Sequence, residues 1–238
     1  MKILITNDDG INAEGIRALA QWAKKLGQVT VIAPKVEQSG KRHAIEFTKP
    51  YDIYTVDFDP EITAWVVDST PADCVRFGFM GLKERYDLVL SGINRGVNLG
   101  ADIVYSGTVG AIFEATRMNS RGIAISTYPD TLEAAVKELD LVFDYMKERE
   151  LLSLNPIYNV NIPESPKGIR ITKQGSPYFS DEFTHLDGNS YLQMGRKLPD
   201  VEPDDQTRDT VSVEAGYISI TPLMATRTNM ELFHALNN

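Results

Sequence analysis

The sequence predicts a doubly wound α/β core with a mostly parallel sheet, followed by a β-rich C-terminal extension. Over roughly the first 150 residues, short apolar runs that suit buried strands alternate with helix-period patterns. Near residue 151 the pattern changes to short alternating runs separated by Pro, Gly and Asp. We therefore expect a core at residues 1–150 and a hairpin-rich extension at residues 151–238.

The composition is that of a globular protein, with 42% hydrophobic and 24% charged residues among 238. The formal net charge of −9 argues against a nucleic-acid backbone binder, which needs a basic face. The only cysteine, Cys74, excludes an intrachain disulfide framework and fits a reducing compartment. The apolar run before Asn7 is too short for a signal peptide, and no stretch approaches about 18 apolar residues. We therefore expect a cytoplasmic protein with no membrane partner and no stable nucleic-acid partner.

The core elements follow from periodicity and from their end signals. Each expected strand is a short apolar run bounded by turn residues, and these runs lie at residues 2–6, 28–33, 64–68, 87–91 and 122–127. The helices between them show apolar residues at helical spacing, and they are expected at residues 13–26, 70–82, 106–118 and 132–146.

The extension carries shorter strand signals. Three alternating runs lie at residues 157–162, 169–173 and 217–221, and we interpret them as hairpins rather than as βαβ units. Residues 178–209 are polar and irregular, with a few aromatic side chains.

The first strand ends in two adjacent carboxylates, Asp8 and Asp9, within the sequence NDDG. In open α/β sheets the carboxyl ends of the strands are where ligands bind. Two adjacent carboxylates repel each other and need a counter-charge, so a hard divalent cation is a natural partner. The alternative is that Asp8 and Asp9 only form a turn and cap the next helix.

Three further polar features are expected at the same sheet edge. Ser39 follows the second strand, and Asn94, the last residue of SGIN, follows the strand at residues 87–91. With the two aspartates they offer only oxygen ligands. Such ligands favour Mg²⁺ or Mn²⁺ over structural zinc. The run Ser106-Gly107-Thr108 opens a helix, where free N–H groups and the dipole favour an anion. A metal beside an anion site indicates phosphate chemistry.

Each of these features also has a purely structural interpretation. Ser39-Gly40 is compatible with an ordinary turn, and Thr108 with a helix cap. His185 and His234 lie in no metal-ligand spacing and are expected to be bystanders, whereas the role of His43, close to Ser39, is left open. The sequence contains neither a GxSxG elbow nor a Cys–His arrangement that would support acyl chemistry.

Several motifs, taken together and in this order, resemble those of the survival protein SurE family. They span nearly the whole chain and comprise NDDG with Gly15, Ser39-Gly40, TPADCV at residues 70–75, SGIN-x-G-x-N-x-G at residues 91–100, YSGTVGA at residues 105–111 and GYISITPL at residues 216–223. The segment Lys41-Arg42-His43 and residues 197–210 depart from the family pattern.

The resemblance implies a Rossmann-like core with one divalent-metal site and a C-terminal hairpin and tail that build a homodimer or homotetramer. It implies metal-dependent phosphatase activity on nucleoside monophosphates. By matching positions, the implied metal ligands are Asp8, Asp9, Ser39 and Asn94. The positions implied to line the phosphate pocket are Asn98, Ser106, Gly107 and Thr108.

The sequence therefore predicts a phosphomonoesterase in which Asp8 or Asp9 is the nucleophile or the base. The sequence does not choose between these two roles. Within the enzyme class, the competing hypothesis is an aspartyl-phosphate phosphatase of different fold, whose acids are separated by one residue. The hypothesis from another class is a nucleotide-sensing module without turnover, which would need the anion site but not both aspartates.

Overall fold

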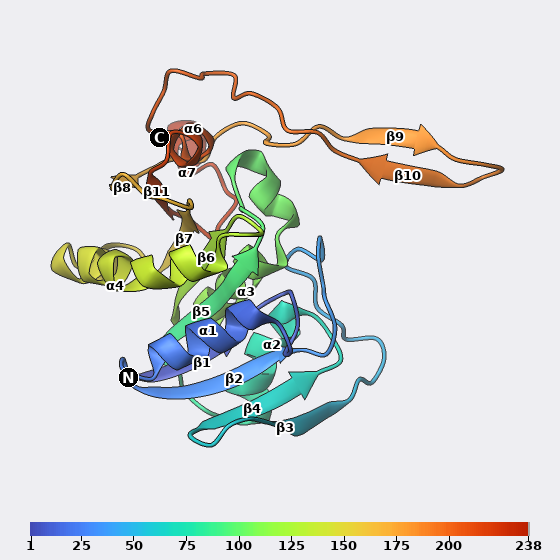
Figure 1. Ribbon diagram of the computed structural model, residues 1–238, viewed down its shortest axis with the longest axis vertical. Coiled ribbons are helices and arrows are strands. Elements are labelled where there is room, and N and C mark those ends of the chain that lie inside the picture. Colours follow the sequence, from blue (N-terminus) through green and yellow to red (C-terminus); the bar gives the residue numbers. More distant parts are fainter. Residues whose placement is uncertain (238) are drawn as a thin grey trace.

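The computed structural model describes residues 1–237 and is organised around one nine-stranded sheet (Figure 1). The strands between β4 and β7 in the sheet are parallel, and the strands at the two edges run antiparallel to them. In spatial order the strands are β3 (Ile53–Asp59), β4 (Ile62–Val67), β2 (Gln28–Pro34), β1 (Lys2–Thr6), β5 (Leu88–Arg95), β6 (Arg121–Thr127), β7 (Ile157–Ile162), β11 (Ile218–Pro222) and β8 (Ile169–Ile171).

The order of the strands reverses at β1. From β1 the chain first builds outward through β2 and β4, and then returns to add β5, β6 and β7 on the other side. Such a reversal leaves a crevice outside the carboxyl ends of the two central strands. The predicted doubly wound α/β fold is confirmed, and the crevice lies beyond β1 and β5.

Helices cover both faces of the sheet. On the near face in Figure 1, α1 (Glu14–Ala23) and α4 (Leu132–Glu148) pack over a core that includes Ile3 and Ile5 of β1. On the far face, α2 (Pro71–Arg76) and α3 (Gly107–Arg117) pack over a second core that includes Leu4. All three apolar side chains of β1 are therefore fully buried, which explains its continuous apolar run.

Short helices connect these elements. They are the π-helical turn η1 (Phe77–Gly81), the 3₁₀ helix η2 (Gly100–Tyr105), α5 (Leu151–Leu154), α6 (Asp209–Glu214) and the C-terminal α7 (Met230–Asn237). Within residues 1–237, no helix combines the length and the apolar character that crossing a bilayer requires.

The interpretation of residues 157–162 as part of a hairpin is wrong. This segment is β7, which pairs in parallel with β6 after α4 and so completes a βαβ unit. Its sequence alternates between apolar residues and asparagines, yet all its residues are buried. Asn159 and Asn161 tolerate burial because both side chains donate to the Asn98 carbonyl, at 2.8 and 2.9 Å.

The segment at residues 169–173 is also not a hairpin. Strand β8 pairs in parallel with β11, and β11 pairs antiparallel with β7, so both extend the main sheet. The division of the chain at residue 150 stays a prediction, although β7, β8 and β11 share one sheet with the strands before it.

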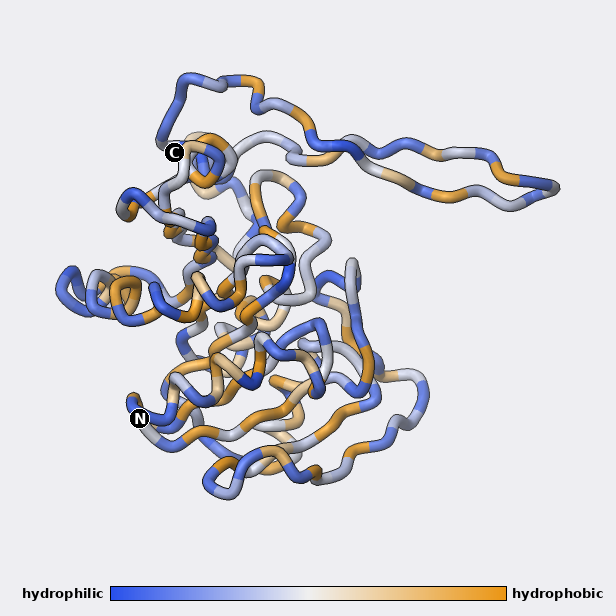
Figure 2. Tube along the Cα trace, in the orientation of Figure 1, coloured by the Kyte–Doolittle hydropathy of each residue, from blue (hydrophilic) through white to orange (hydrophobic). Residues whose placement is uncertain are grey.

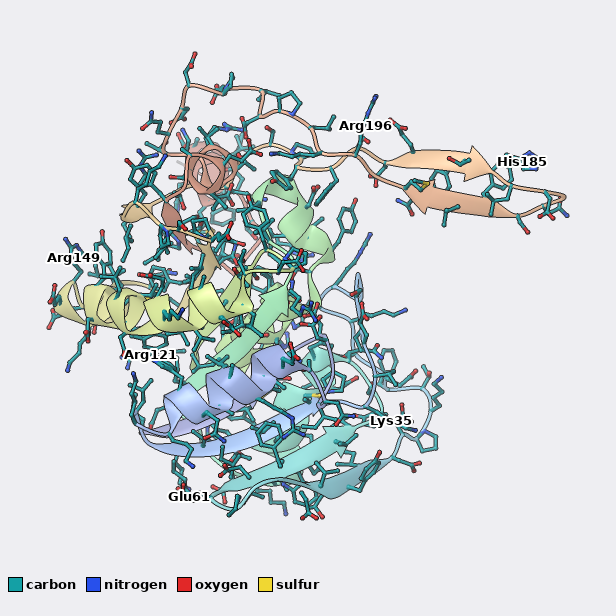
Figure 3. The ribbon with its side chains drawn as sticks, viewed as in Figure 1. Lys35, Glu61, Arg121, Arg149, His185 and Arg196 are labelled. Atoms are coloured by element: carbon teal, nitrogen blue, oxygen red, sulfur yellow. The ribbon has the colours of Figure 1, made fainter. Side chains whose placement is uncertain are left out.

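One hairpin stands apart from the main sheet. Strands β9 (Glu182–His185) and β10 (Tyr191–Met194) pair with each other and project away from the body of the molecule, with His185 in the projecting part and Arg196 at its base (Figures 1 and 3). Every residue of both strands is exposed. Hydrophobic positions occur along both arms (Figure 2).

Candidate active site at the carboxyl ends of β1 and β5

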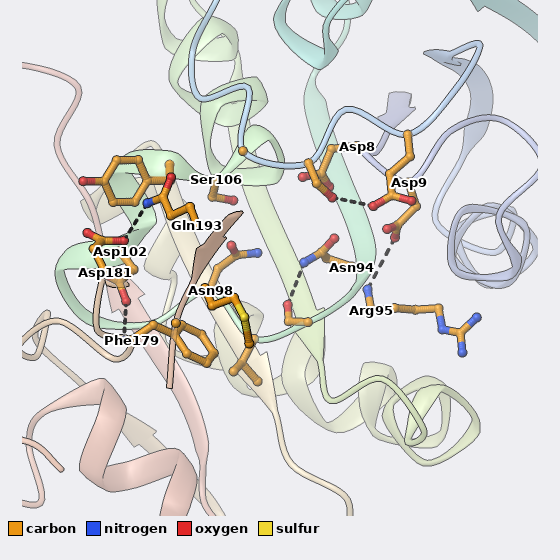
Figure 4. A pocket seen from close by; sticks show the side chains of 18 of the residues that line it. Asp8, Asp9, Asn94, Arg95, Asn98, Asp102, Ser106, Phe179, Asp181 and Gln193 are labelled. Carbon is orange, nitrogen blue, oxygen red and sulfur yellow. Dashed lines mark hydrogen bonds between the residues drawn. The ribbon is translucent and has the colours of Figure 1, made fainter. Parts of the chain in front are cut away.

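A pocket of about 480 Å³ occupies the crevice between the ends of β1 and β5 and the base of the β9–β10 hairpin (Figure 4). Three parts of the chain line it: the loops after β1 and β2, the segment from the end of β5 to the start of α3, and the hairpin base, which comprises residues just before β9 and at the end of β10. Its lining includes Asp8, Asp9, Glu37, Ser39, Asn94, Arg95, Asn98, Asp102, Tyr105, Ser106, Phe179, Asp181, Gln193 and Met194.

The turn that carries the acid pair is held by Asn7. The Asn7 side-chain amide donates to the Gly10 carbonyl at 2.9 Å, and the Gly10 N–H donates back to Asn7 Oδ1 at 3.2 Å. Gly10 has a φ of +96°, which is favourable only for glycine. NDDG thus forms a closed turn that presents Asp8 and Asp9 at the end of β1.

Asp8 is buried, with 5% of its surface exposed, against the N-terminus of α3. The Thr108 hydroxyl donates to Asp8 Oδ1 at 2.6 Å. Gly107 lies so close that a Cβ at this position would be 3.0 Å from the Asp8 Cβ. Burial raises the pKa of Asp8 to about 6, although the Thr108 hydrogen bond opposes this shift; the charge of Asp9 adds to it.

Asp9 lies closer to solvent than Asp8. The Arg95 N–H donates to Asp9 Oδ2 at 3.4 Å, as marked in Figure 4. Burial raises the pKa of Asp9 as well, against the effect of this hydrogen bond. Both carboxylates of the pair are therefore held in surroundings that disfavour their ionised forms unless a positive charge is close.

Ser39 and Asn94 complete the set of oxygen atoms near the pair. The loop that carries Ser39 is tied to β1, because the Gln38 N–H donates to the Asp8 carbonyl at 2.7 Å. Ser39 Oγ donates to Glu37 Oε1 at 2.6 Å, which leaves its lone pairs available. The Asn94 Nδ2 donates to the Gly96 carbonyl at 2.6 Å and leaves Oδ1 as a free acceptor.

The charges of the pocket lining favour a cation. Five carboxylates line it, from Asp8, Asp9, Glu37, Asp102 and Asp181, against a single basic side chain, that of Arg95. Among residues 1–237, no group of three or more His, Cys, Asp or Glu side chains gathers into a metal cluster. Two carboxylates beside neutral oxygens form a donor set of the kind that suits Mg²⁺ or Mn²⁺.

The residues predicted to bind phosphate divide into two groups. Asn98 and Ser106 line the pocket, and the Asn98 backbone is fixed by Asn161, whose Oδ1 accepts from the Asn98 N–H at 2.8 Å. Gly107 and Thr108 do not line the pocket. Both residues contact the Asp8 side chain at the N-terminus of α3, so they support this carboxylate.

Comparison with known proteins identifies the family. Residues 3–181 match the model of the family described as survival protein SurE. The chain belongs to this family. It is 38% identical to a "5'-nucleotidase SurE" of Thermoanaerobacter sp. (strain X514), over 100% of this chain and 98% of that protein. It is 39% identical to the protein of the same name from Syntrophotalea carbinolica, over 100% of this chain and 96% of the relative.

A solved structure extends the similarity to three dimensions. The fold resembles the crystal structure of the SurE protein from Aquifex aeolicus, with a TM-score of 0.80 and 32% identity. The superposition covers 100% of this chain and 98% of that one. The family, and the fold class that the sequence predicted, therefore rest on full-length similarity.

Several pocket residues of this SurE-family chain were not anticipated from its sequence. Glu37 and Asp102 come from the loops beside Ser39 and Asn98, whereas Phe179, Gln193 and Met194 come from the base of the hairpin. No local pattern marks the hairpin residues, since they reach the pocket only through the long-range fold. Glu37 and Asp102 do carry a chemical signal, since each is an acid close in sequence to a predicted site residue.

His43, whose role was left open, lies outside the pocket and anchors the Ser39 loop to α3. Its Nε2 is 2.7 Å from Glu114 Oε2, and Arg76 Nη1 donates to Glu114 Oε1 at 3.0 Å. The Glu114 side chain is only 2% exposed. Burial works against ionisation of Glu114, but the hydrogen bonds and charges of His43 and Arg76 outweigh it, so the pKa of Glu114 lies below its ordinary value.

We predict that Glu114→Gln lowers the stability of the protein by about 1–3 kcal/mol near neutral pH, because charged partners lose their counter-charge. The folded-state pKa of Glu114 is depressed, so its contribution is present above the ordinary value of 4.5 and is lost as pH falls through the folded value. Thermal melts of both proteins from pH 7 downward should show a difference that shrinks in acid. A difference that is constant with pH would contradict this account.

Proposed function

We propose that the chain is a divalent-metal-dependent phosphomonoesterase that hydrolyses nucleoside 5′-monophosphates to nucleoside and phosphate. Its full-length relatives are named 5′-nucleotidase SurE, which supports the substrate class. The observation that carries the proposal is the pair of desolvated carboxylates, Asp8 and Asp9, in a pocket that also opens onto the N-terminus of a helix.

The proposed metal ligands are Asp8, Asp9, Ser39 and Asn94. Their free oxygen atoms and the excess of carboxylates in the lining support this assignment. A bound divalent ion would polarise the phosphoryl group and neutralise its charge. We propose that this ion is Mg²⁺ or Mn²⁺.

The proposed phosphate site uses Asn98 and Ser106, with Gly107 and Thr108 behind them at the start of α3. Ser106 caps this helix by accepting from the Val109 N–H at 3.1 Å, which fixes the helix N-terminus at the pocket wall. The positive end of the helix favours the phosphate anion. Either Asp8 or Asp9 serves as the nucleophile or as the base that activates a water.

The test of this function is a substrate panel with purified protein. We expect hydrolysis of nucleoside 5′-monophosphates to exceed that of simple sugar phosphates, and to require added Mg²⁺ or Mn²⁺, since oxygen ligands bind these ions exchangeably. Full turnover after exhaustive chelation would refute the metal requirement. Binding of nucleotides without any turnover would favour the nucleotide-sensing module instead.

We also propose that the chain forms a homodimer or a homotetramer through its hairpin and its C-terminal tail. An isolated two-stranded hairpin is marginally stable in water, and this one exposes Phe183 (68%), Tyr191 (63%) and Leu192 (47%). Helix α7 similarly exposes Leu232 (53%) and Phe233 (49%). A second copy that covers these apolar side chains would account for their exposure.

A cytoplasmic location stays a proposal, supported by the single cysteine.

Shortening the hairpin should weaken this assembly. In the test variant, residues 184–192 are replaced by Asn-Gly, so that Phe183 and Gln193 still face each other across a tight turn. We expect a lower mass by light scattering and little change in the melting temperature of the core. The matched control substitutes residues 187–189 at the hairpin tip and leaves the length of the hairpin unchanged. An unchanged mass in the shortened variant would refute the assembly role of the hairpin.

A further inference from the structure

The hairpin base forms a second, chemically different side of the active-site pocket. In Figure 4, Phe179, Asp181 and Gln193 lie across the pocket from Asp8 and Asp9. Met194 lines the pocket as well. This side therefore combines an aromatic ring, a thioether, an amide and a carboxylate.

Phe179 is held in place although its ring is accessible. The N–H groups of Tyr178 and Phe179 both donate to Asp102 Oδ2, each at 2.8 Å, which ties the base of the hairpin to η2. The buried Tyr178 ring contacts the Phe179 ring edge to face, with 5.0 Å between the centroids. Phe179 remains 46% exposed. A half-exposed ring on a fixed backbone is a preformed surface for stacking.

Polar groups next to this ring are oriented as well. Gln193 Nε2 donates to Asp181 Oδ1 at 3.0 Å, which leaves Gln193 Oε1 and the second carboxylate oxygen of Asp181 free to accept hydrogen bonds. These free acceptors suit the amino and ring N–H groups along the edge of a nucleobase.

The charge on this side disfavours a second anionic group. Asp102 and Asp181 are its only charged side chains, whereas the one basic residue of the lining, Arg95, lies on the side of the acid pair (Figure 4). A longer phosphate chain would meet like charge here, while a neutral aromatic group would not.

We propose that the hairpin base binds the nucleobase of the substrate, with the Phe179 ring as its stacking surface and Asp102 as the residue that positions the ring. This inference rests on the proposed function and adds to it a specificity-determining site on the hairpin. The phosphate then lies toward the acid pair and the base toward the hairpin. A pocket of about 480 Å³ is within the usual range for a ligand of this size.

The test compares substrates with and without a base. In Phe179→Ala we expect KM for a nucleoside 5′-monophosphate to rise about five- to tenfold, the lower part of the usual effect of losing a base–aromatic stack, because the ring is half exposed. The value of kcat should change little, since the base lies away from the reacting phosphoryl group. KM for ribose 5-phosphate should be unchanged.

Two further variants separate stacking from structural effects. Phe179→Tyr keeps an aromatic face and should restore KM for the nucleotide. Tyr54→Ala removes an exposed aromatic side chain of β3, outside both the pocket and the hairpin, and it should leave both KM values as in the wild type. Equal rises for nucleotide and ribose 5-phosphate in Phe179→Ala, or no rise for either, would overturn the assignment.

A binding measurement keeps the inference testable independently of turnover. Saturation-transfer NMR should detect adenosine on the wild-type protein and show a clearly weaker signal on Phe179→Ala. Equal signals from the two proteins, or none from either, would overturn the nucleobase site even if the protein proves to be a phosphatase. Loss of the adenosine signal in the variant would support the site even if turnover fails.

Discussion

The structure depends on two adjacent carboxylates, Asp8 buried and Asp9 partly buried, at the point where the strand order reverses. Packing at the end of β1 removes Asp8 from water and shields Asp9 in part, and burial raises the pKa of both carboxyl groups. The Thr108 hydroxyl offsets part of this unfavourable burial at Asp8, and the Arg95 N–H offsets part of it at Asp9. A divalent cation at this pair would offset the remainder.

Much of the fold could be predicted because its core elements follow local rules. The apolar run of β1 and the Thr70-Pro71 start of α2 carry their structure in a few neighbouring residues. The sequence wrongly predicts a hairpin at β7 because Asn159 and Asn161 resemble the polar face of a half-exposed strand. Their burial depends on the Asn98 carbonyl, more than 60 residues away in the chain, and periodicity cannot reveal such a partner.

The site was predictable to the extent that it follows from sheet geometry. Asp8 and Ser39 follow β1 and β2, and Asn94 lies near the carboxyl end of β5, so the parallel sheet brings all three to one edge. The hairpin's Phe179 and the anchor Glu114 could not be found this way. Phe179 reaches the pocket through an excursion outside the sheet, and Glu114 resembles any charged residue of a helix until His43 and Arg76 are placed beside it.

The most direct test of the metal site is a calorimetric titration of Mn²⁺ into Asp8→Asn, Asp9→Asn and the control Asp181→Asn. Both Asp8→Asn and Asp9→Asn should lose more than about tenfold in affinity, because even the loss of a group that only supports a metal ligand costs about 10–100-fold. Asp181 lines the same pocket, but the Asp181→Asn variant should bind the ion with wild-type affinity. Wild-type affinity in both Asp8→Asn and Asp9→Asn would contradict the central claim, because neither carboxylate would then hold the ion.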